Sequence, residues 1–507
     1  MVRSVRLDAG PVSRDQVVAV ARAGAEVELG EAVLKNLAAT RQHVDALAGA
    51  SDPTYGVSTG FGALAVRHIP PDRRIALQRS LIRSHAAGAG SAVEPEVVRA
   101  LMFLRLRTLA GGYTGVRPET AMALAALLNA GIVPVVHEYG SLGCSGDLAP
   151  LAAVALALMG EGEVLDVDGR RPASEALRAA GLKPVTLAEK EGLALTNGTD
   201  GMLGMLVLAL ADLRRLLDTA DLTGAMSVEA LLATDRAFAA DLQGLRPHPG
   251  QAASARRMLA ALRGSEIVAS HRGPDCTRVQ DAYSLRCAPQ VHGAARDTVS
   301  HGELVADREL ASSIDNPVVL PDGRVESNGN FHGAPIAYVL DFLAIPAADV
   351  ASIAERRTDR MLDITRSHGL PAFLADDPGV DSGYMIAQYT QAAVVSELKR
   401  LAVPSSVDSI PSSAMQEDHV SMGWSAARKL RKAVDGLTTV LSIELLAAAR
   451  ALDFRAPLKP APVTAAVRDL VRERVGGPGP DRHLAPEIAA VEELVRSGRI
   501  LNALEEA

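Results

Sequence analysis

The sequence predicts a mainly α fold: a bundle of long helices with a smaller N-terminal region and two small β-hairpins. Hydrophobic residues make up 48% of the 507 residues but aromatic residues only 3%, so Leu, Ala and Val must supply most of the core. Such a composition favours long packed helices over a β-sandwich, which needs more aromatic and β-branched side chains. From about residue 200, Leu and Ala recur at three- and four-residue spacings, as in helices that bury one face.

The first helices are marked by their ends. Ser13-Arg14-Asp15-Gln16 has the form of a capping box, and Gly24 follows as a stop signal. Apolar residues at helical spacing then predict a second helix from Glu31 to Ala48. Further helices are expected over about Asp72–Ala87, Pro95–Ala110 and Pro118–Asn129.

Two short strand patterns interrupt the helices. One covers Val164–Arg170 and turns at Asp168-Gly169. The other covers Val318–Val325 and turns at Asp322-Gly323. Asp-Gly between short apolar runs is typical of a hairpin turn, so we expect two small hairpins.

The longest helices are expected over Gly383–Ala402 and Ser413–Leu452. Long, nearly parallel helices with apolar faces predict a bundle, here one that is shared between subunits. We expect an N-terminal region over residues 1–199 and a helical bundle region over residues 200–507.

Charge and cysteine content exclude several classes of protein. The net charge is −8, and no basic run or basic amphipathic segment indicates nucleic acid or a membrane surface. The start lacks the apolar stretch of a signal peptide, and apolar windows such as Gly201–Ala211 are shorter than the roughly 20 residues that span a bilayer. Cysteines at 144, 276 and 287 form neither a disulfide framework nor a C-x-x-C metal pair. The sequence therefore predicts a soluble, cytoplasmic protein without a metal.

A glycine-rich loop, Gly140-Ser141-Leu142-Gly143-Cys144-Ser145-Gly146-Asp147-Leu148-Ala149-Pro150, precedes an apolar helical segment. Its glycines permit a tight bend, in which the unhindered Gly146 nitrogen can reach the Cys144 carbonyl carbon. Ring closure with loss of water, and loss of the Ser145 hydroxyl as a second water, would leave a five-membered ring with an exocyclic methylidene. A simpler interpretation is that Ser145 or Asp147 caps the following helix. The lysine of a phosphate-binding loop and the G-x-S-x-G spacing of a nucleophile elbow are absent.

The loop resembles the self-cyclising segment of the aromatic amino acid ammonia-lyases, and the similarity extends from about Tyr55 to Gly423. The resemblance implies that Cys144, Ser145 and Gly146 form 4-methylideneimidazole-5-one (MIO), an electrophile, and that no external cofactor is needed. It also implies a homotetramer whose active sites are shared between subunits. Cysteine stands where alanine is commonest, but its side chain lies outside the ring, so cyclisation should survive.

The resemblance also assigns roles to residues outside the loop. Tyr55 matches the catalytic base, which requires positive charge or hydrogen bonds that lower its pKa from about 10. Tyr283 lies beside the electrophile, and Arg286 grips the substrate α-carboxylate, to which a guanidinium fork is suited. The other substrate-binding residues implied are Gln280, Asn197, which bonds the ring carbonyl or the substrate, and Phe331, which packs against the ring. Without the resemblance, Tyr55 would be packing, Asn197 a helix cap and Arg286 the partner of a buried carboxylate.

Two features favour the histidine-specific branch of the family. Ser84-His85 has the order of histidine lyases, whereas tyrosine lyases usually carry His-Leu and phenylalanine lyases Phe-Leu. The segment Gln416–Gly423 contains Glu417, an acid that phenylalanine lyases generally lack, which could orient or charge the imidazole or relay the proton. The resemblance thus implies elimination of ammonia from L-histidine to give trans-urocanate, the first step of histidine degradation. By themselves, His85 suits a helix C-terminus and Glu417 a solvated helix end.

Several positions depart from the family pattern, mostly by losing hydrogen-bonding groups: Ala152, Ala153, Ile364, Thr365, Tyr384 and Met415. They leave open a tyrosine or phenylalanine ammonia-lyase, or a 2,3-aminomutase that re-adds the ammonia at the β-carbon. A third interpretation is an inactive helical assembly protein, which the intact Ser145 and Arg286 disfavour.

Overall fold

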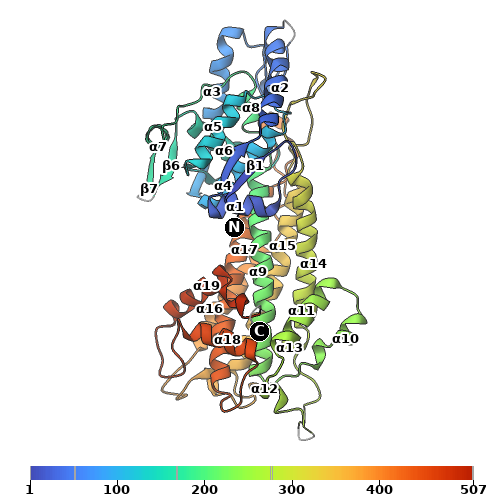
Figure 1. Ribbon diagram of the computed structural model, residues 1–507, viewed down its shortest axis with the longest axis vertical. Helices are drawn as coiled ribbons and strands as arrows, with labels where there is room; N and C mark the ends of the chain where they lie inside the picture. The colour runs from blue at the N-terminus through green and yellow to red at the C-terminus, as the bar shows by residue number, and fades with distance from the viewer. Residues whose placement is uncertain (1, 51–52, 167–168, 274–275, 277, 505–507) are drawn as a thin grey trace. The chain divides into compact units, whose positions relative to one another are not determined.

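The computed structural model describes residues 2–50, 53–166, 169–273, 276 and 278–504, most of which lie in helices (Figure 1). The predicted mainly α fold is confirmed. The chain forms two compact units, each assembled from three stretches of sequence. The first unit comprises Met1–Leu208, Glu303–Asp341 and Pro404–Arg428, and the second comprises Ala209–Gly302, Phe342–Val403 and Lys429–Ala507. The sequence-based boundary at residue 199 stays a prediction.

The first unit begins with two parallel strands, β1 (Ser4–Leu7) and β2 (Glu26–Leu29), joined through α1 (Arg14–Ala23). The predicted capping box is confirmed, because the Gln16 N–H donates to Ser13 Oγ and the Ser13 N–H donates to the Gln16 side chain. Gly24 ends the helix with a φ of +66°, a conformation that favours glycine.

The next predicted helices are present with nearly the expected bounds. α4 (Pro95–Ala110) and α5 (Pro118–Asn129) both begin with proline at the first helical position, where its missing N–H costs nothing. α3 (Arg74–His85) follows the 3-10 helix η2 (Pro71–Arg73). The other elements of this unit are α2 (Glu31–Gly49), η1 (Gly62–Leu64), β3 (Ala89–Ala92), β4 (Val133–Pro134), β5 (His137–Tyr139), α6 (Leu148–Leu158), α7 (Ala173–Ala179), α8 (Glu191–Ala194) and η5 (Ser413–Met415).

Both predicted hairpins are confirmed. β6 (Glu163–Asp166) pairs antiparallel with β7 (Gly169–Pro172), and β4 adds a third strand to this sheet. The predicted turn residue Asp168 lies outside the described residues. β8 (Val318–Val319) pairs with β9 (Val325–Glu326). The sequence did not predict the pair of β3 with β5, which directly precedes the glycine-rich loop.

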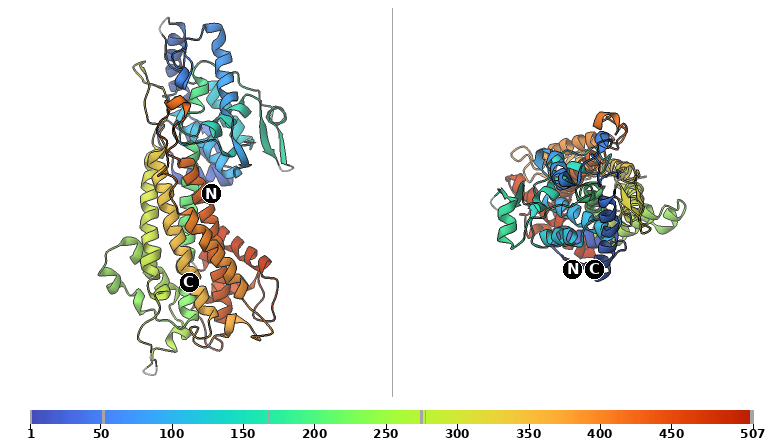
Figure 2. Two further views of the ribbon diagram at one scale, coloured as in Figure 1. Left: turned by 180° about the vertical axis from the view of Figure 1, so that it is seen from behind. Right: turned by 90° about the horizontal axis from the view of Figure 1, so that it is seen from above.

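Long helices form the core of the second unit, and both ribbon views draw them side by side there (Figures 1 and 2). They are α9 (Asp200–Ala230), α14 (Ala288–Leu310), α15 (Ala334–Leu362) and α17 (Gly423–Asp453). The shorter elements of the unit are η3 (Arg236–Phe238), α10 (Ala240–Gly244), α11 (Pro249–Ala261), α12 (Glu266–Ala269), α13 (Tyr283–Arg286), η4 (Ala372–Leu374), α16 (Met385–Leu401), α18 (Pro462–Arg472), α19 (Leu484–Ser497) and η6 (Arg499–Leu504). The helix predicted over Gly383–Ala402 is confirmed as α16.

The helix predicted over Ser413–Leu452 is wrong at its start, because α17 begins only at Gly423. Residues 413–422 form the short 3-10 helix η5 and a loop, and Ser413, Ala414, Met415 and Met422 in this segment have positive φ. The Met422 N–H donates to the Leu142 carbonyl, so contact with the glycine-rich loop replaces the helical hydrogen bonds that the sequence pattern favoured.

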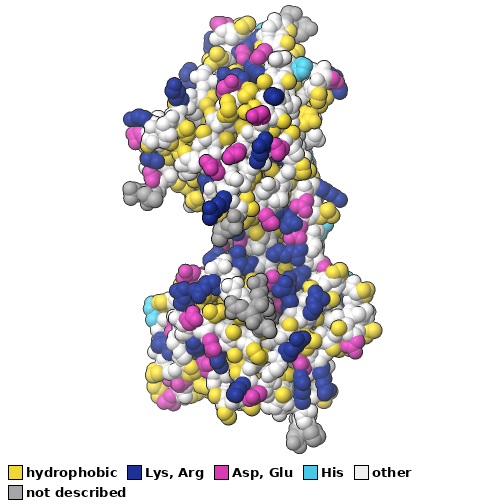
Figure 3. Space-filling view, viewed as in Figure 1, with side chains coloured by type: hydrophobic (Ala, Val, Ile, Leu, Met, Phe, Trp, Pro, Cys, Tyr) yellow, Lys and Arg dark blue, Asp and Glu magenta, His cyan; other side chains and the backbone are white. Residues whose placement is uncertain are grey.

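The burial of the apolar helix α15 and the distribution of surface charge show whether the structure offers a membrane-contacting region. Among the described residues, α15 alone is long and apolar enough to cross a membrane. However, 61% of its most apolar 18-residue stretch is buried inside the protein. Core helices meet the same criterion. On the face shown in Figure 3, Lys and Arg side chains are interspersed with Asp and Glu rather than gathered into one basic region.

A buried carboxylate joins three of the long helices in the second unit. Glu444 of α17 accepts hydrogen bonds from Arg357 Nε and Nη2 of α15 at 2.5 and 3.0 Å. The hydroxyls of Thr223 and Ser227 on α9 donate to the same carboxylate at 2.9 and 2.7 Å. Arg357 and Glu444 are both 0% exposed, so neither charge has water as an alternative partner.

We expect Arg357→Ala to destabilise the protein by about 3–5 kcal/mol, because it leaves the Glu444 charge buried without its cation. The neighbouring Arg356→Ala is the matched control, since its side chain is 55% exposed and its ion pair with Glu355 should contribute less than about 1 kcal/mol. Denaturant unfolding of both variants gives the comparison. Equal losses would show that burial of this pair does not determine its contribution.

Candidate active site

The glycine-rich loop lies against the segment that precedes α9. Gly146 has a φ of +80° and forms a parallel bridge with Gly198, and the Asp147 N–H donates to the Gly198 carbonyl at 2.7 Å. A Cβ added at Gly146 would overlap the backbone of Gly198, which cannot yield as a flexible side chain could. Glycine at 146 is therefore required both by its φ and by this close approach.

Asp147 fixes the loop from the inside. Its carboxylate is fully buried and accepts hydrogen bonds from the Ser141 hydroxyl at 2.8 Å and from the Gly201 and Met202 N–H groups at 2.9 Å. Burial raises its pKa to about 7. These N–H groups belong to the first turn of α9, so the Asp147 carboxylate caps α9 and makes no cap hydrogen bond to α6. Asp147 thus occupies the N-cap position of α6, as the helix-capping interpretation expected, but its side chain does not cap that helix.

A cavity of about 500 Å³ in the first unit opens beside the loop and brings together five of the predicted site residues: Tyr55, Cys144, Ser145, Phe331 and Glu417. Its other lining residues are Gly62, Ala63, Ala65, Val66, Asn316, Ser327, Asn328, His332, Gln416, Asp418 and His419. The Gly143 carbonyl accepts hydrogen bonds from the Gly333 N–H at 3.0 Å and from the Ser421 hydroxyl at 2.7 Å. These bonds hold the lining segments 327–332 and 416–419 to the glycine-rich loop.

Glu417 faces the Cys144-Ser145-Gly146 triplet. The Ser145 hydroxyl donates to Glu417 Oε1 at 3.1 Å, and the Cys144 thiol donates to Oε2 at 3.2 Å. The Ser412 hydroxyl also donates to Oε2, at 3.0 Å. Glu417 is therefore not at a solvated helix end but in a loop, at hydrogen-bond distance from the residue expected to become electrophilic.

Tyr55 lies in the cavity with its hydroxyl accepting a hydrogen bond from the Gly62 N–H at 3.3 Å. Burial raises the pKa of Tyr55 above 10; the Gly62 hydrogen bond lowers it, and the negative charge of Glu417 raises it further. The surroundings within one chain thus act against the phenolate that a catalytic base requires.

His85 ends α3, as predicted, and its Nδ1 lies 3.1 Å from Ser84 Oγ. Burial lowers its pKa below 6.5, and the Leu81 carbonyl and Glu417 only partly oppose this shift. The lowered pKa favours the neutral imidazole, in which one ring nitrogen can donate and the other can accept. His85 does not line the cavity itself.

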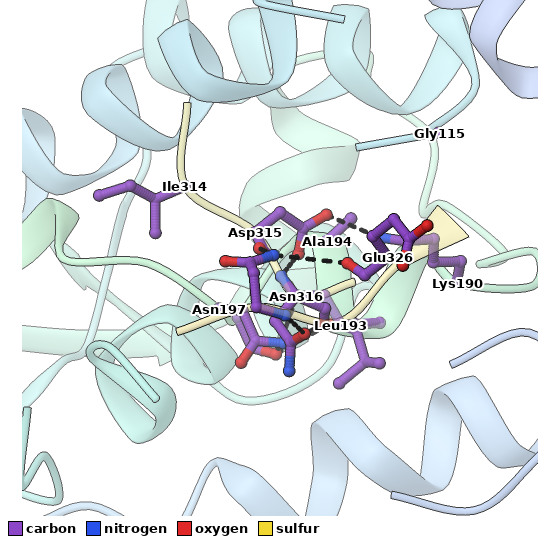
Figure 4. Close-up of polar contacts among 12 residues, drawn as sticks. Gly115, Lys190, Leu193, Ala194, Asn197, Ile314, Asp315, Asn316 and Glu326 are labelled. Atoms are coloured by element: carbon purple, nitrogen blue, oxygen red, sulfur yellow. Dashed lines mark hydrogen bonds and ion pairs between the residues drawn. The ribbon is translucent and has the colours of Figure 1, made fainter. Parts of the chain in front are cut away.

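Asn197 lies beside Asn316 in a network of polar contacts (Figure 4). Its Nδ2 donates to the Asn316 carbonyl at 3.2 Å, and Asn316 lines the cavity. Asp315 is held by a buried ion pair with Lys190 Nζ at 2.5 Å and accepts the Asn316 N–H at 2.8 Å. Asn328, also in the wall, donates to the Asp315 carbonyl at 3.0 Å. Burial lowers the pKa of Lys190 and raises that of Asp315, while each charge stabilises the other.

We expect Lys190→Met to lower the free energy of unfolding by about 3 kcal/mol, since Asp315 loses its only cationic hydrogen-bond donor among the described residues. Lys183→Met, at an exposed position nearby in the sequence, is the control and should change little. The double variant Lys190→Met with Asp315→Leu should be less destabilised than the single one, because no buried charge is then left unpaired. Additive losses in thermal or denaturant unfolding would contradict this role.

Gln280, Tyr283 and Arg286 belong to the second unit, and none of them lines this cavity. Gln280 is exposed and lines a separate cavity of about 250 Å³. Tyr283 is 71% exposed, and the Arg286 guanidinium carbon lies 4.7 Å from the centre of its ring. Among the described residues, the buried Nε of Arg286 has no hydrogen-bond partner. The alternative role of Arg286, as the partner of a buried carboxylate, therefore gains no support from this nitrogen.

Sequence reasoning missed the residues that hold the site, above all Ser412, Lys190 and Asp315. Their side-chain contacts, and for Lys190 and Asp315 their burial, distinguish them, and neither leaves a local signal in a single sequence. Two departures from the family pattern are now placed: Ala152 is buried in α6, and Tyr384 is 2% exposed with the Arg450 guanidinium carbon 5.3 Å from its ring centre.

Known proteins are similar to this chain in sequence along nearly its whole length. The sequence pattern of the aromatic amino acid lyases matches residues 12–473. The chain is 67% identical to a histidine ammonia-lyase of Streptomyces coelicolor over 496 residues, which cover 97% of each chain. It is 50% identical to a histidine ammonia-lyase of Anaeromyxobacter sp. over 505 residues, covering 98% of this chain and 99% of that one.

Solved structures are similar over nearly the same length. The histidine ammonia-lyase of Trypanosoma cruzi aligns with a TM-score of 0.91 at 38% identity, covering 99% of this chain and 95% of that one. The tyrosine aminomutase of Streptomyces globisporus aligns with a TM-score of 0.94 at 36% identity, covering 99% and 98%. The fold alone thus does not separate a lyase from a mutase.

Proposed function

The chain belongs to the aromatic amino acid lyase family, and we propose that it eliminates ammonia from L-histidine to give trans-urocanate. It is then a carbon–nitrogen lyase that catalyses the first step of histidine degradation. The observation that carries the choice of substrate is the Glu417 carboxylate, 3.1 Å from Ser145 Oγ, because a carboxylate can accept the N–H of an imidazole. High identity to relatives named histidine ammonia-lyase supports the same choice over a tyrosine or phenylalanine enzyme.

Cys144, Ser145 and Gly146 fit the MIO group expected in this family. The triplet lies in a tight loop, Gly146 takes a φ that favours glycine, and its Cα packs where a Cβ would overlap Gly198. When formed, the group supplies an electrophilic carbon beside the substrate, which no ordinary side chain provides. The neighbouring Phe331 lines the same cavity and supplies an apolar wall.

The chain's own side chains then bind the substrate and move its proton. Glu417 accepts the imidazole N–H of the substrate, and His85 forms a hydrogen bond with the same imidazole ring. Tyr55 removes the β-proton, which requires a phenolate, and burial within one chain opposes that state. We infer that a cation from outside the first unit lowers the pKa of Tyr55.

A second copy of the chain supplies that cation and completes the site in our proposal. Arg286 binds the substrate α-carboxylate, next to Tyr283 and Gln280, and its buried Nε has no partner among the described residues. Tyr338, Phe342 and Ile345 recur at helical spacing on α15 and are 60%, 47% and 48% exposed, an apolar stripe that association of chains would cover. The assembly proposed is a homotetramer in the cytoplasm.

The direct test offers the purified protein L-histidine, L-tyrosine and L-phenylalanine separately and follows the conjugated acrylate product. We expect turnover of histidine to exceed that of the other two by orders of magnitude. Formation of β-amino acids would identify a 2,3-aminomutase instead. No product from any of the three would support the inactive assembly protein.

Complementation between two inactive variants tests the shared site. We expect Ser145→Ala and Arg286→Ala each to lose most activity alone, because one removes the electrophile and the other the carboxylate ligand. When both variants are co-expressed with different affinity tags and purified as mixed oligomers, some sites regain both side chains, so activity should return. The matched control is Ser145→Ala with Glu417→Gln, which lie in one cavity of one chain and should not complement. Failure of the Arg286 pair to complement would place Arg286 in the same subunit as Ser145.

A further inference from the structure

The Cys144 thiol makes a contact that the proposed function does not use. It is 6% exposed, and its Sγ lies 3.2 Å from Glu417 Oε2. The Ser412 hydroxyl donates to the same oxygen at 3.0 Å, whereas the Ser145 hydroxyl donates to the other oxygen, Oε1, at 3.1 Å. The two oxygens of Glu417 are thus held by different groups.

Conversion of the triplet removes only one of these groups. Ser145 would lose its hydroxyl, so Oε1 of Glu417, a residue that lines the cavity, would lose this donor and gain a free acceptor position. Oε2 keeps both of its donors, because the Cys144 side chain lies outside the ring and Ser412 takes no part in it. A carboxylate fixed by one oxygen can present the other in a single orientation.

We propose, on the basis of the proposed function, that Cys144 and Ser412 are positioning residues that hold Oε2 of Glu417 so that Oε1 accepts the imidazole N–H of the substrate. The thiol is the donor in this contact because it stays protonated. Burial raises its pKa to about 12, and the negative charge of Glu417 acts in the same direction. The other titratable groups near this carboxylate are Tyr55, His85, His332, Asp418 and His419.

The proposal predicts a specific pattern of kinetic effects on histidine. Cys144→Ala should lower kcat/KM by about 5-fold, the size expected for a weak donor to a charged acceptor, and Cys144→Ser should restore most of the loss. Ser412→Ala should cause a loss of similar size. In a Glu417→Gln background, Cys144→Ala should cause no further loss, since both changes act through one carboxylate. The mass of the loop peptide from each variant shows whether its triplet has been converted.

A second measurement tests the contact without turnover. Glu417→Gln removes the negative charge that raises the thiol pKa, so Cys144 should react with iodoacetamide faster at a given alkaline pH than in the unchanged protein. The exposed Cys276 is the internal control, and its rate should not change.

Two results would overturn the proposal. One is a loss from Cys144→Ala that is equally large with and without the Glu417→Gln change, since the thiol would then act independently of the carboxylate. The other is an alkylation rate of Cys144 that does not respond to Glu417→Gln. If the unchanged protein does not convert histidine, the proposed function fails, whereas the alkylation rates still decide whether the thiol and Glu417 interact.

Discussion

The close approach of Gly146 to Gly198 is the constraint on which the first unit depends. At this point two backbones touch without side chains between them, and the Asp147 N–H bonds the Gly198 carbonyl. Asp147 then directs its carboxylate to the first turn of α9, so that the loop, Asn197 and the long helix are fixed by one junction. The tight bend needed for ring closure is thus part of the packing of the unit rather than a property of the loop alone.

Buried charges form the second layer of support. Arg105 donates to the carbonyls of Ala194, Asn197 and Ile314 and pairs with Asp200 at 2.8 Å, while Lys190 pairs with Asp315. Such pairs add little net stability compared with apolar packing, but removing one partner is costly. Their effect here is geometric, because they hold the backbone of the segments that carry Asn197 and the cavity residue Asn316.

Local chemistry explains what the sequence could predict. The bounds of α4 and α5 follow from proline at the first helical position, and α1 follows from its capping box, all of which act within a few residues. Residues 413–422 could not be predicted, since contacts of this segment with the distant glycine-rich loop override its helical pattern. The same limit applies to the site. Ser145 and Glu417 were recognisable from their motifs, but the contacts of Ser412 with Glu417 and of Lys190 with Asp315 form only in the folded chain. The pKa of Tyr55 depends on burial, which the sequence does not state.

In the proposed function, Cys144, Ser145 and Gly146 react with one another in the folded loop. Peptide mass spectrometry of the segment containing Gly140–Pro150, taken from protein with measured activity on histidine, tests it most directly. We expect a segment lighter than its sequence by two molecules of water, with the loss confined to the triplet. A segment of full mass in active protein would contradict it.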